Sequence, residues 1–436
     1  MGSNNPEKAS KPRSRALNSM RVAVIGLGYV GLPVAIAANR VGHTVVGIDI
    51  DDGRIKRLGA GESYVGDISD AEIAQAYDTG RFEASCDFAA AVEFDIAIVT
   101  VPTPLNEGVP DLSYIEASAE ALAPLLRRGC CVVLESTTYP GTTEELFGPI
   151  LENGSGLAAG EGFHLGYSPE RIDPGNKRYT LESTPKVVSG IDQASTKVIA
   201  DFYASFVTEV VPVSGTREAE LTKLLENTFR HVNIALVNEL AMFASDLGVN
   251  VWESIDAASS KPFGFMRFEP GPGVGGHCLP IDPSFLSWRV RRHLGQTFRF
   301  VELANDVNDH MPDFVVRRLS SSLNRVKLPL NGSTIILLGV TYKPNSGDAR
   351  EAPAQRIRDL LEAAGARVLA VDPHYDDAGS GPNYELVELT EEVLTGSDAV
   401  VLVTDHELID YDLVLEHAPL ILDTRNRLTG ANVERL

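Results

Sequence analysis

The sequence lacks the long apolar runs that a membrane-spanning protein requires. None of its runs approaches the roughly 18 consecutive apolar residues of a bilayer-spanning helix. The first residues, Met1 to Met20, mix Asn, Pro, Lys, Ser and Arg without the apolar segment of a secretion signal. We therefore expect a soluble protein, with residues 1–19 as a disordered extension and Met20 as a candidate natural start.

Cysteine is also scarce. The four cysteines, Cys86, Cys130, Cys131 and Cys278, show neither the spacing of a metal site nor that of a disulfide framework. Free thiols without a secretion signal favour a reducing compartment. We therefore expect a cytoplasmic protein that holds no metal.

Positive charge is in deficit. The sequence has 38 Lys and Arg residues against 60 Asp and Glu residues, a formal net charge of −22. This charge repels nucleic acids and anionic lipid surfaces, so we expect neither as a partner, although a local cationic pocket can still hold a phosphorylated ligand. With 436 residues, 44 % of them hydrophobic, the chain is long enough for two or three globular domains. An enzyme that acts on a small molecule is favoured.

The segment that starts at Arg21, RVAVIGLGYVGLPVAIAANRVGHTVVGIDID, combines a strand, a glycine-rich turn, a helix pattern and a second strand that ends in acid. Gly26 permits the tight turn, Gly28 lets the backbone approach a pyrophosphate, and Gly31 lets the helix pack on the strand. The N–H groups at the helix N-terminus would then bind the phosphates. Two further residues of the turn are expected at the cofactor: Tyr29 and Val30.

An acidic residue follows at the spacing of a dinucleotide site. Asp49 ends the second strand, where a carboxylate accepts hydrogen bonds from ribose hydroxyls and repels a 2′-phosphate, so NAD is favoured over NADP. Arg54 is expected either at the adenine end or on the exposed surface. Thr103 and Thr137 follow strands and are candidates for the cofactor crevice, with turn or cap threonines as the alternative.

Strand and helix patterns alternate along the rest of the chain. Strand candidates occur at FDIAIVTVP, CCVVLES, FHLGYSP, PKVVSG and EVVPVSG, and a second α/β pattern without the glycine fingerprint begins at Thr334 with TIILLGV. We predict an α/β fold with two Rossmann-like, doubly wound parallel sheets, joined by a long central helix and a helical connector. The expected boundaries are 20–215 for the N-terminal domain, 216–325 for the connector and 326–436 for the C-terminal domain.

The long helical run from Thr216 to Gly248 carries apolar residues on more than one face. Such a helix is buried, here between domains and against another subunit, which predicts a homodimer or a higher homo-oligomer. The alternative is a helix wholly within one large core.

The segment PGPGVGGHCLPIDP, residues 270–283, surrounds one cysteine with glycine and proline. This composition describes a fixed loop with little side-chain bulk near the sulfur, which can admit a ligand. A thiolate is the reactive form of cysteine, and His277 and Asp282 are the local titratable groups. On these residues alone, Cys278 is either a nucleophile or an ordinary buried cysteine.

Five ordered motifs resemble the UDP-glucose/GDP-mannose dehydrogenase family: GLGYVGLP, YSPERIDPGN, LTKLLENTFR, PGPGVGGHCLPIDP and GVTYKPNSGDAREAP. The resemblance covers the chain from about Met20 onward. It implies NAD-dependent, two-step oxidation of the primary alcohol of a UDP-linked hexose to a carboxylate, with a UDP-sugar site on the C-terminal domain. SPERIDPGN and PFGFM are most similar to the UDP-N-acetylglucosamine 6-dehydrogenase branch, which serves surface polysaccharide synthesis. UDP-glucose and UDP-N-acetylmannosamine are the alternative substrates.

The resemblance also implies roles for single residues. Cys278 matches the nucleophile that forms a thiohemiacetal and then a thioester. Lys223 matches the lysine that stabilises oxyanions, and Asn227, one helical turn later, matches an amide that positions the substrate. Asp282 matches an aspartate that assists proton transfer through water, and Glu170 matches a carboxylate for acid/base work on the thioester.

Basic residues and the cysteine loop complete the implied substrate site. Lys343 and Arg350 match residues that reach the nucleotide sugar and the NAD side, respectively. Arg171 and Gly275 are expected at the substrate. Arg230 and its neighbour His231 either point to the substrate or form a helix-surface pair.

The chain departs from the family pattern at two places. UDP-glucose members carry a second glutamate shortly after the one that Glu170 matches, whereas this chain has Asp173 and Pro174. Arg267 and Glu269 replace residues expected to be proline and tyrosine in the closest branch, which puts sugar or phosphate contacts there in doubt.

Overall fold

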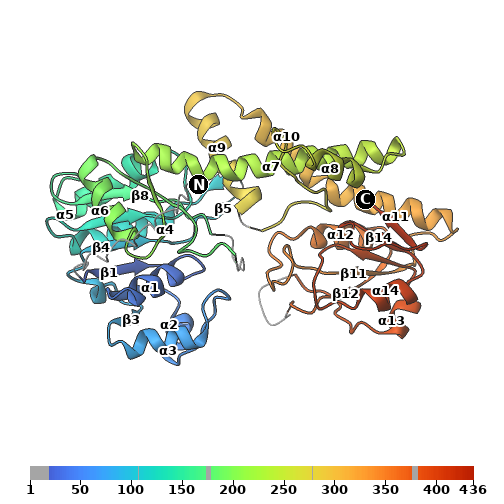
Figure 1. Ribbon diagram of the computed structural model, residues 1–436, viewed down its shortest axis with the longest axis horizontal. Coiled ribbons are helices and arrows are strands. Elements are labelled where there is room, and N and C mark those ends of the chain that lie inside the picture. The colour runs from blue at the N-terminus through green and yellow to red at the C-terminus, as the bar shows by residue number, and fades with distance from the viewer. Residues whose placement is uncertain (1–18, 107, 173–177, 277, 376–381) are drawn as a thin grey trace, which may run out of the picture. The chain divides into compact units, whose positions relative to one another are not determined.

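The computed structural model describes residues 19–106, 108–172, 178–276, 278–375 and 382–436, with the side chain of Cys278 excluded. The chain divides into two compact units (Figure 1), each described separately below. Within the described residues, unit 1 comprises the chain up to Thr103 together with 112–136 and 141–220, and unit 2 comprises 104–111, 137–140 and 221–436. The division falls inside one helix, between Glu220 and Leu221.

Unit 1 is built on an eight-stranded sheet with the order β10-β9-β8-β7-β4-β1-β2-β3. The central strands consist almost wholly of buried apolar residues, because helices cover both faces of the sheet and leave no solvated side. The strands are β1 (Arg21–Ile25), β2 (Thr44–Ile48), β3 (Phe82–Ser85), β4 (Ile96–Val99), β7 (Cys131–Leu134), β8 (His164–Tyr167), β9 (Lys186–Gly190) and β10 (Val210–Pro212).

The helices of unit 1 connect these strands and confirm the predicted alternation. Short polar residues cap several of them; Ser69, for example, forms a reciprocal capping box with Glu72 at the start of α3. The helices are α1 (Gly31–Arg40), α2 (Asp52–Gly59), α3 (Asp70–Asp78), α4 (Ser113–Leu122), α5 (Gly148–Ser155) and α6 (Gln193–Tyr203).

The predicted Rossmann-like fold is confirmed, and its parallel sheet contains one antiparallel pair. Strands β8 and β9 pair in antiparallel fashion, with Gly166 opposite Gly190 and Tyr167 opposite Ser189. A parallel pair needs a crossover, usually a helix, to bring the chain back to the starting edge. No helix lies between β8 and β9 in the part of the connection that the structure describes, whereas α6 makes the crossover from β9 to β10, which are parallel.

Unit 2 contains a helical part and a second sheet. Five parallel strands form this sheet, in the order β12-β11-β13-β14-β15, as the second α/β pattern predicted. The strands are β11 (Thr334–Leu338), β12 (Arg367–Val371), β13 (Ala399–Leu402), β14 (Ile421–Asp423) and β15 (Val433–Arg435), and a hairpin of β5 (Leu105–Asn106) and β6 (Val109–Pro110) also belongs to this unit. The helices are α7 (Thr216–Asp246), α8 (Val251–Ser259), α9 (Cys278–Leu294), α10 (Arg299–Asp309), α11 (Met311–Arg325), α12 (Pro353–Ala363), α13 (Glu391–Thr395) and α14 (Tyr411–His417).

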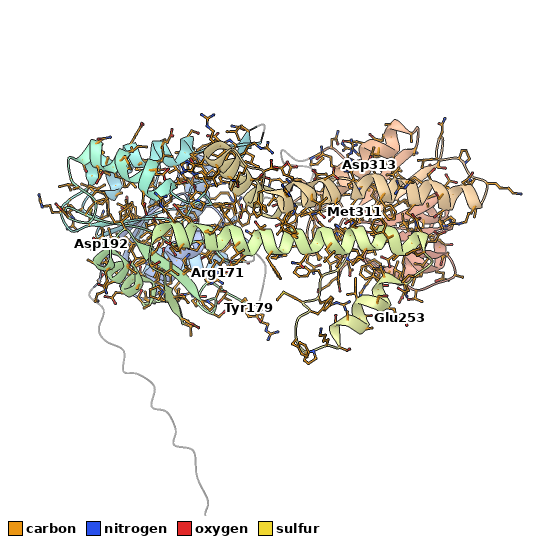
Figure 2. All side chains as sticks on the ribbon, turned by 90° about the horizontal axis from the view of Figure 1, so that it is seen from above. Arg171, Tyr179, Asp192, Glu253, Met311 and Asp313 are labelled. Atoms are coloured by element: carbon orange, nitrogen blue, oxygen red, sulfur yellow. The ribbon has the colours of Figure 1, made fainter. Side chains whose placement is uncertain are left out.

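Helix α7 has 31 residues and confirms the predicted long helix. One face is buried, with Leu224, Val237 and Ala241 at most 6 % exposed. The alternative, a helix wholly within one core, is wrong, because a second face is solvent-exposed in the single chain; Figure 2 looks onto the length of this helix. We call the exposed apolar residues of this face the α7 stripe: Leu221, Leu225, Phe229, Leu236, Leu240 and Phe243.

The turn after the first strand contains the same hydrogen bond in both sheets: a carboxylate at the end of the neighbouring strand accepts a main-chain amide of the turn. In unit 1, Asp49 at the end of β2 accepts the amide of Leu27 through Oδ2 at 2.8 Å. In unit 2, Asp372 at the end of β12 accepts the amide of Val340 through Oδ2 at 2.7 Å. The C-terminal α/β unit therefore keeps the carboxylate of a nucleotide-binding turn although its glycine pattern differs.

A buried carboxylate fixes the start of α7 within unit 1. Oε2 of Glu220 accepts the amide of Gly141 at 2.6 Å, and Oε1 accepts the amide and the hydroxyl of Thr143 at 2.9 and 2.7 Å. Burial raises the pKa of Glu220 to about 7, against the lowering effect of these hydrogen bonds. The folded chain therefore holds a proton on Glu220 that an exposed glutamate would release near pH 4.5.

This pKa predicts a pH-dependent stability. Between pH 4.5 and 7 the folded state binds the Glu220 proton more tightly than the unfolded state, so the contribution of this group falls as pH rises through that window. Glu220→Gln should lower Tm at pH 5, because one acceptor is lost, but its Tm should then decline less between pH 5 and 8 than that of the unsubstituted chain.

The measurement is a series of thermal unfolding curves across this pH range. Glu218→Gln, an exposed position on the same turn of α7, is the matched control and should keep the original slope. Parallel Tm profiles for Glu220→Gln and the unsubstituted chain would show that Glu220 does not titrate in this window.

Candidate active site

The glycine turn between β1 and α1 has the geometry of a phosphate-binding loop. Gly26 has a φ of +90°, and a Cβ at Gly31 would lie 1.8 Å from the carbonyl oxygen of Gly26, so the chain itself requires glycine at both positions. A Cβ at Gly28 would meet nothing within 4 Å. Packing therefore does not explain Gly28, and the open space beside it fits the backbone approach of a pyrophosphate.

The first turn of α1 has few N–H groups left for a ligand, because Leu32 donates to the carbonyl oxygen of Gly28 at 3.1 Å, Val34 donates to that of Val30 at 3.4 Å and Pro33 has no N–H group. A phosphate would therefore meet the amides that precede this turn. No side chain caps this helix at Val30, and no acidic residue lies in its first turn. Tyr29 is half exposed beside it. This arrangement fits the phosphates of NAD, which need N–H donors and the positive end of a helix dipole.

Asp49 and Arg54 lie together at the end of β2. Asp49 is 5 % exposed, and its Oδ1 accepts the amide of Asp51 at 2.9 Å while its Oδ2 lies 3.2 Å from Nη1 of Arg54. The two oxygens of Asp49 are hydrogen-bond acceptors of the kind that binds ribose hydroxyls. Arg54 thus contacts the predicted ribose-binding residue and is neither isolated nor fully on the surface.

The structure adds a threonine that the sequence analysis did not select. Oγ1 of Thr100, directly after β4, donates to the carbonyl oxygens of Ile25 at 3.0 Å and Gly26 at 2.7 Å and so holds the glycine turn against the sheet. Its place at the carboxyl end of a central strand was the available signal. Thr103, the residue selected instead, lies three positions further along this loop.

In unit 2, helices α7 and α9 bring together three of the predicted catalytic residues. Nδ2 of Asn227 donates to Oδ2 of Asp282 at 2.6 Å, and Nζ of Lys223 lies 4.0 Å from the same oxygen. Lys223 also donates to Oγ1 of Thr137. Lys223 and Asn227 share one face of α7 because they are four residues apart, and Thr137, predicted at the cofactor, contacts the lysine instead.

Burial sets the electrostatics of this cluster. Asp282 is 3 % exposed, and desolvation raises its pKa, while the Lys223 ammonium and the Asn227 amide act in the opposite direction. An aspartate in this setting can hold a proton at higher pH than an exposed one. The pair therefore offers a cation for a developing oxyanion and a carboxyl group for proton transfer.

Glu170 belongs to a buried charge network within unit 1. Nζ of Lys186 lies 3.7 Å from Oε2 of Glu170 and 3.1 Å from Oε1 of Glu135, and it donates to the carbonyl oxygen of Pro169 at 3.2 Å. Burial raises the pKa of Glu135, opposed by Lys186. Tyr203 donates its hydroxyl to Glu135. Neither Lys186 nor Glu135 stood out in the sequence, because both lie within ordinary strand patterns.

The predicted substrate contact Arg171 has a role in the loop itself. Its Nη1 donates to the carbonyl oxygen of Pro185 at 2.6 Å. Asp173 and Pro174, where the chain departs from the family pattern, lie outside the described residues.

The cysteine loop packs closely against the segment after β11. A Cβ at Gly275 would lie 2.7 Å from the carbonyl oxygen of Glu351 and 2.8 Å from the Cβ of Tyr342, and the amide of Gly276 donates to the carbonyl oxygen of Arg350 at 3.3 Å. Glycine is therefore required here by a neighbouring backbone. The backbone of Cys278 begins α9, whereas its side chain and all of His277 lie outside the described residues.

The two basic residues of the C-terminal segment neighbour the residues that contact this loop: Lys343 follows Tyr342, and Arg350 precedes Glu351. Nε of Arg350 donates to Oδ1 of Asp348 at 2.8 Å, and its Nη2 pairs with Oδ2 at 2.5 Å, while the guanidinium remains exposed. Lys343 is half-buried. The prediction that both contact nucleotides stays a prediction.

The structure separates Arg230 and His231, which were expected either at the substrate or as a helix-surface pair. Arg230 is exposed, but His231 is 1 % exposed and its Nε2 lies 2.7 Å from Oδ1 of Asn305. A helix-surface pair is therefore wrong for His231, whose pKa burial lowers, against the hydrogen bond to Asn305.

The two departures near the cysteine loop are paired with each other. Nε of Arg267 lies 3.0 Å from Oε1 of Glu269, and its Nη1 lies 2.5 Å from Oδ1 of Asp256. Both charges of the Arg267–Glu269 pair are thus engaged within the protein, which gives them a structural role.

Comparison with known proteins agrees with this geometry. Three models of the UDP-glucose/GDP-mannose dehydrogenase family match the chain: the NAD binding domain over residues 20–207, the central domain over 217–310 and the UDP binding domain over 336–430. The chain belongs to the UDP-glucose/GDP-mannose dehydrogenase family. It is an NAD-dependent nucleotide-sugar dehydrogenase, and the expectation of NAD is confirmed.

Individual relatives cover nearly the whole chain. The UDP-N-acetyl-D-mannosamine dehydrogenase of Pyrococcus horikoshii is 35 % identical over 89 % of this chain and 90 % of its own length. The UDP-N-acetyl-D-glucosamine 6-dehydrogenase of Pseudomonas aeruginosa is 34 % identical over 89 % and 91 %. The solved structure of UDP-D-ManNAc dehydrogenase from P. horikoshii superposes with a TM-score of 0.87 at 33 % identity, covering 95 % of this chain and 98 % of that one.

None of the helices in the described ranges is both long enough and apolar enough to cross a bilayer.

Gly31 is tightly packed and Gly28 is not, so substitutions at the two positions should change different properties: thermal stability at Gly31 and NAD affinity at Gly28. Gly31→Ala should lower Tm by several degrees, because overpacking costs about 1–3 kcal/mol and its Cβ would overlap the Gly26 carbonyl. Gly28→Ala should keep Tm, because its Cβ meets open space, but should weaken NAD binding roughly tenfold, about 1.4 kcal/mol.

Thermal unfolding without NAD and calorimetric titration with NAD measure the two effects. Gly59→Ala, a glycine of α2 whose Cβ would also meet nothing within 4 Å, is the control and should change neither quantity by as much. Unchanged NAD affinity in Gly28→Ala would place the pyrophosphate elsewhere.

Proposed function

We propose that this chain oxidises the C6 alcohol of a UDP-linked N-acetylhexosamine to the carboxylate, with Cys278 as nucleophile. The observation that carries the proposal is the cluster of Lys223, Asn227 and Asp282. Oδ2 of Asp282 lies 2.6 Å from Nδ2 of Asn227 and 4.0 Å from Nζ of Lys223. The cluster joins α7, which precedes the cysteine loop in the chain, to α9, which begins at Cys278. The chain would be a cytoplasmic enzyme, in keeping with the free thiols of Cys86, Cys130 and Cys131 among the described residues.

Each residue has a defined task in the proposed reaction. NAD, held by the turn from Gly26 to Gly31 and by Asp49, supplies the hydride acceptor for both oxidations. Lys223 would stabilise the alkoxide and later the tetrahedral oxyanion, and Asp282 would accept and return protons through water. The thiolate of Cys278 would add to the aldehyde carbon to give a thiohemiacetal, and oxidation would leave a thioester.

Glu170 is suited to the last step. Water must lose a proton as it attacks the thioester carbon, and the cysteine sulfur must leave as a thiolate. The Glu170 carboxyl group, 3.7 Å from the Lys186 ammonium, would accept that proton. Arg171, Arg230, Gly275 and Lys343 remain proposed substrate contacts, and Thr103, Thr137 and Arg350 remain proposed on the cofactor side.

The N-acetyl substrate class is supported by the sequence and by the relatives. SPERIDPGN and KPFGFM follow the N-acetyl branch. Relatives of similar identity, 33–35 %, carry the names of UDP-N-acetyl-mannosamine, UDP-N-acetylglucosamine and NDP-N-acetylgalactosaminuronic acid dehydrogenases. The epimer we expect is UDP-N-acetylglucosamine, with the mannosamine epimer and UDP-glucose as alternatives.

We further propose that the α7 stripe is the contact between two copies of the chain. Its residues repeat at intervals of three, four and seven along one face and are 41–62 % exposed. A continuous apolar face of this kind on an otherwise acidic chain favours a self-complementary partner surface.

The reaction predicts its own stoichiometry. With UDP-N-acetylglucosamine, complete turnover should give about two NADH per sugar without free aldehyde, and kcat/KM should exceed that for UDP-glucose by roughly tenfold, because UDP-glucose leaves the acetamide-binding groups unpaired. The assay measures NADH and uronic acid for UDP-N-acetylglucosamine, UDP-N-acetylgalactosamine, UDP-N-acetylmannosamine and UDP-glucose in one buffer.

Cys278→Ala tests the covalent step in the same assay. It should retain binding of the nucleotide sugar and form essentially no acid, whereas Cys86→Ala, at an exposed cysteine of unit 1, should leave the yield unchanged. A yield of only one NADH per sugar, or acid formation by Cys278→Ala, would contradict the proposed mechanism.

The α7 stripe predicts the mass in solution. Light scattering after size exclusion should give at least twice the mass of one chain, and Leu240→Arg should reduce it to one chain, because an arginine would be desolvated in the contact. Leu408→Arg places the same charge at a leucine that is 69 % exposed outside α7 and should not change the mass. A dimeric Leu240→Arg would assign the contact to another surface.

A further inference from the structure

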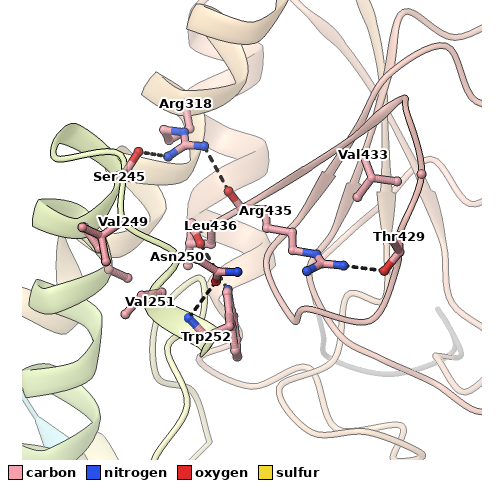
Figure 3. Close-up of a pocket in the computed structure, with 13 residues that line it drawn as sticks. Ser245, Val249, Asn250, Val251, Trp252, Arg318, Thr429, Val433, Arg435 and Leu436 are labelled. Carbon is pink, nitrogen blue, oxygen red and sulfur yellow. Dashed lines mark hydrogen bonds between the residues drawn. The ribbon is translucent and has the colours of Figure 1, made fainter. Parts of the chain in front are cut away.

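A cavity of about 470 Å³ lies within unit 2, where the C-terminal end of α7, the start of α8, helix α11 and strand β15 meet (Figure 3). Its size is that of a site for a small organic molecule. Lys223, Asn227 and Asp282 do not line it, and neither does any residue of the α7 stripe. The cavity is therefore separate from both the candidate catalytic cluster and the proposed subunit contact.

Two arginines line the cavity, and their hydrogen-bond partners are neutral. Arg318 of α11 donates from Nη1 to the hydroxyl of Ser245 and from Nη2 to the carbonyl oxygen of Arg435 at 3.0 Å. Arg435 donates from Nε and Nη2 to the carbonyl oxygen of Leu428 at 3.1 and 2.9 Å, and from Nη2 also to the hydroxyl of Thr429. In the described parts of the chain, no carboxylate oxygen lies within 4.0 Å of either guanidinium.

The nearby carboxylate is already engaged. Arg325, not Arg318, forms the ion pair with Glu434, which also accepts the hydroxyl of Ser322 at 2.7 Å. Desolvation lowers the pKa of Arg318, with Glu434 as the largest opposing influence. Arg318 therefore carries a half-buried charge that its hydrogen-bonding neighbours do not neutralise.

The cavity also has a flat apolar wall. The indole of Trp252 is 3 % exposed, and its Nε1 donates to the main-chain oxygen of Leu436 at 3.2 Å, which fixes the ring. Ala241, Ala244 and Val251 add aliphatic surface. A fixed aromatic ring beside guanidinium groups suits a ligand that carries both a ring and an anionic end.

We infer that this cavity is a second, non-catalytic binding site for a small organic oxyanion with a flat ring. Each guanidinium offers five N–H donors, of which Arg318 uses two and Arg435 up to three within the described protein. The remaining donors can bind a phosphate or carboxylate group, and the ring would lie against Trp252. The two guanidinium charges outnumber the one negative charge that the main-chain carboxylate of Leu436, the last residue of the sequence, adds to the lining, so the cavity favours anions.

A ligand in this cavity would connect two parts of unit 2. Ser245 belongs to α7, the helix that carries Lys223 and Asn227, whereas Arg435 belongs to β15 of the C-terminal sheet. Binding would hold these elements together and stabilise the folded chain by mass action.

Calorimetric titration of the full chain tests the site with four probes. Phenyl phosphate and benzoate carry a ring and an anion, inorganic phosphate carries the anion alone, and benzyl alcohol carries the ring alone. We expect saturable binding of phenyl phosphate, benzoate or both, weaker binding of inorganic phosphate and none of benzyl alcohol. Phenyl phosphate against benzoate distinguishes a phosphate ligand from a carboxylate ligand.

Arg318→Gln should weaken the binding of the tighter anionic probe roughly tenfold or more. Arg317→Gln is the matched control, since Arg317 is the exposed neighbour on α11 and the charge change is identical. Arg435→Gln is the second variant and should give the same loss if Arg318→Gln fails to fold.

Equal binding by Arg318→Gln or Arg435→Gln and the control, or binding of benzyl alcohol as tight as that of phenyl phosphate, would overturn the inference. The outcome is independent of the dehydrogenase activity, which is measured separately.

Discussion

The main constraint in both sheets is the corner, by which we mean the turn that directly follows the first strand in the chain, β1 in unit 1 and β11 in unit 2. Gly26 and Gly339 both have positive φ values, +90° and +76°, and in each case a carboxylate from the neighbouring strand binds the amide of the next residue. A side chain at either glycine would collide with the carbonyl oxygen of a threonine that follows a neighbouring strand, Thr100 after β4 and Thr404 after β13. This three-part corner sets where the sheet ends and hence where a ligand can reach backbone amides.

The two corners differ in what the carboxylate binds next. Asp49 has Arg54 at 3.2 Å, with open space nearby at Gly28. Asp372 instead has Nε2 of His406 at 3.1 Å, and both side chains are fully buried. The same strand order thus supports one corner that is open to a pyrophosphate and one that is filled by an imidazole, which explains why only the first carries the glycine fingerprint.

Two lysines of this acidic chain are buried beside carboxylates. Lys223 and Lys186 are each at most 8 % exposed, and each lies within 4.0 Å of a carboxylate. A buried ammonium is costly unless it is paired, so both positions are maintained by specific partners and not by the overall charge. Lys223 lies 4.0 Å from Oδ2 of Asp282, whereas Lys186 lies between two glutamates, Glu135 and Glu170.

The sequence predicted most elements because its strands and helices follow their periodicities closely. The glycine turn, Asp49, the length of α7 and the proximity of Lys223 to Asn227 were all predictable, since each depends on spacing within one element. The antiparallel β8–β9 pair, the role of Lys186 and the burial of His231 were not, because each depends on a partner 17 to 74 residues away. Arg267 and Glu269 show a different limit: two departures from a family pattern, two residues apart, form an ion pair with each other, which only their geometry revealed.

The close fit of Gly275 and Gly276 against Tyr342 and Glu351 links the cysteine loop to a segment synthesised about seventy residues later. Domains generally begin to fold as they leave the ribosome. This loop, however, has nothing to pack against until the start of the C-terminal sheet has emerged. The backbone of the loop would then take its final conformation only near the end of translation, so that a chain interrupted earlier lacks the surface that shapes the loop.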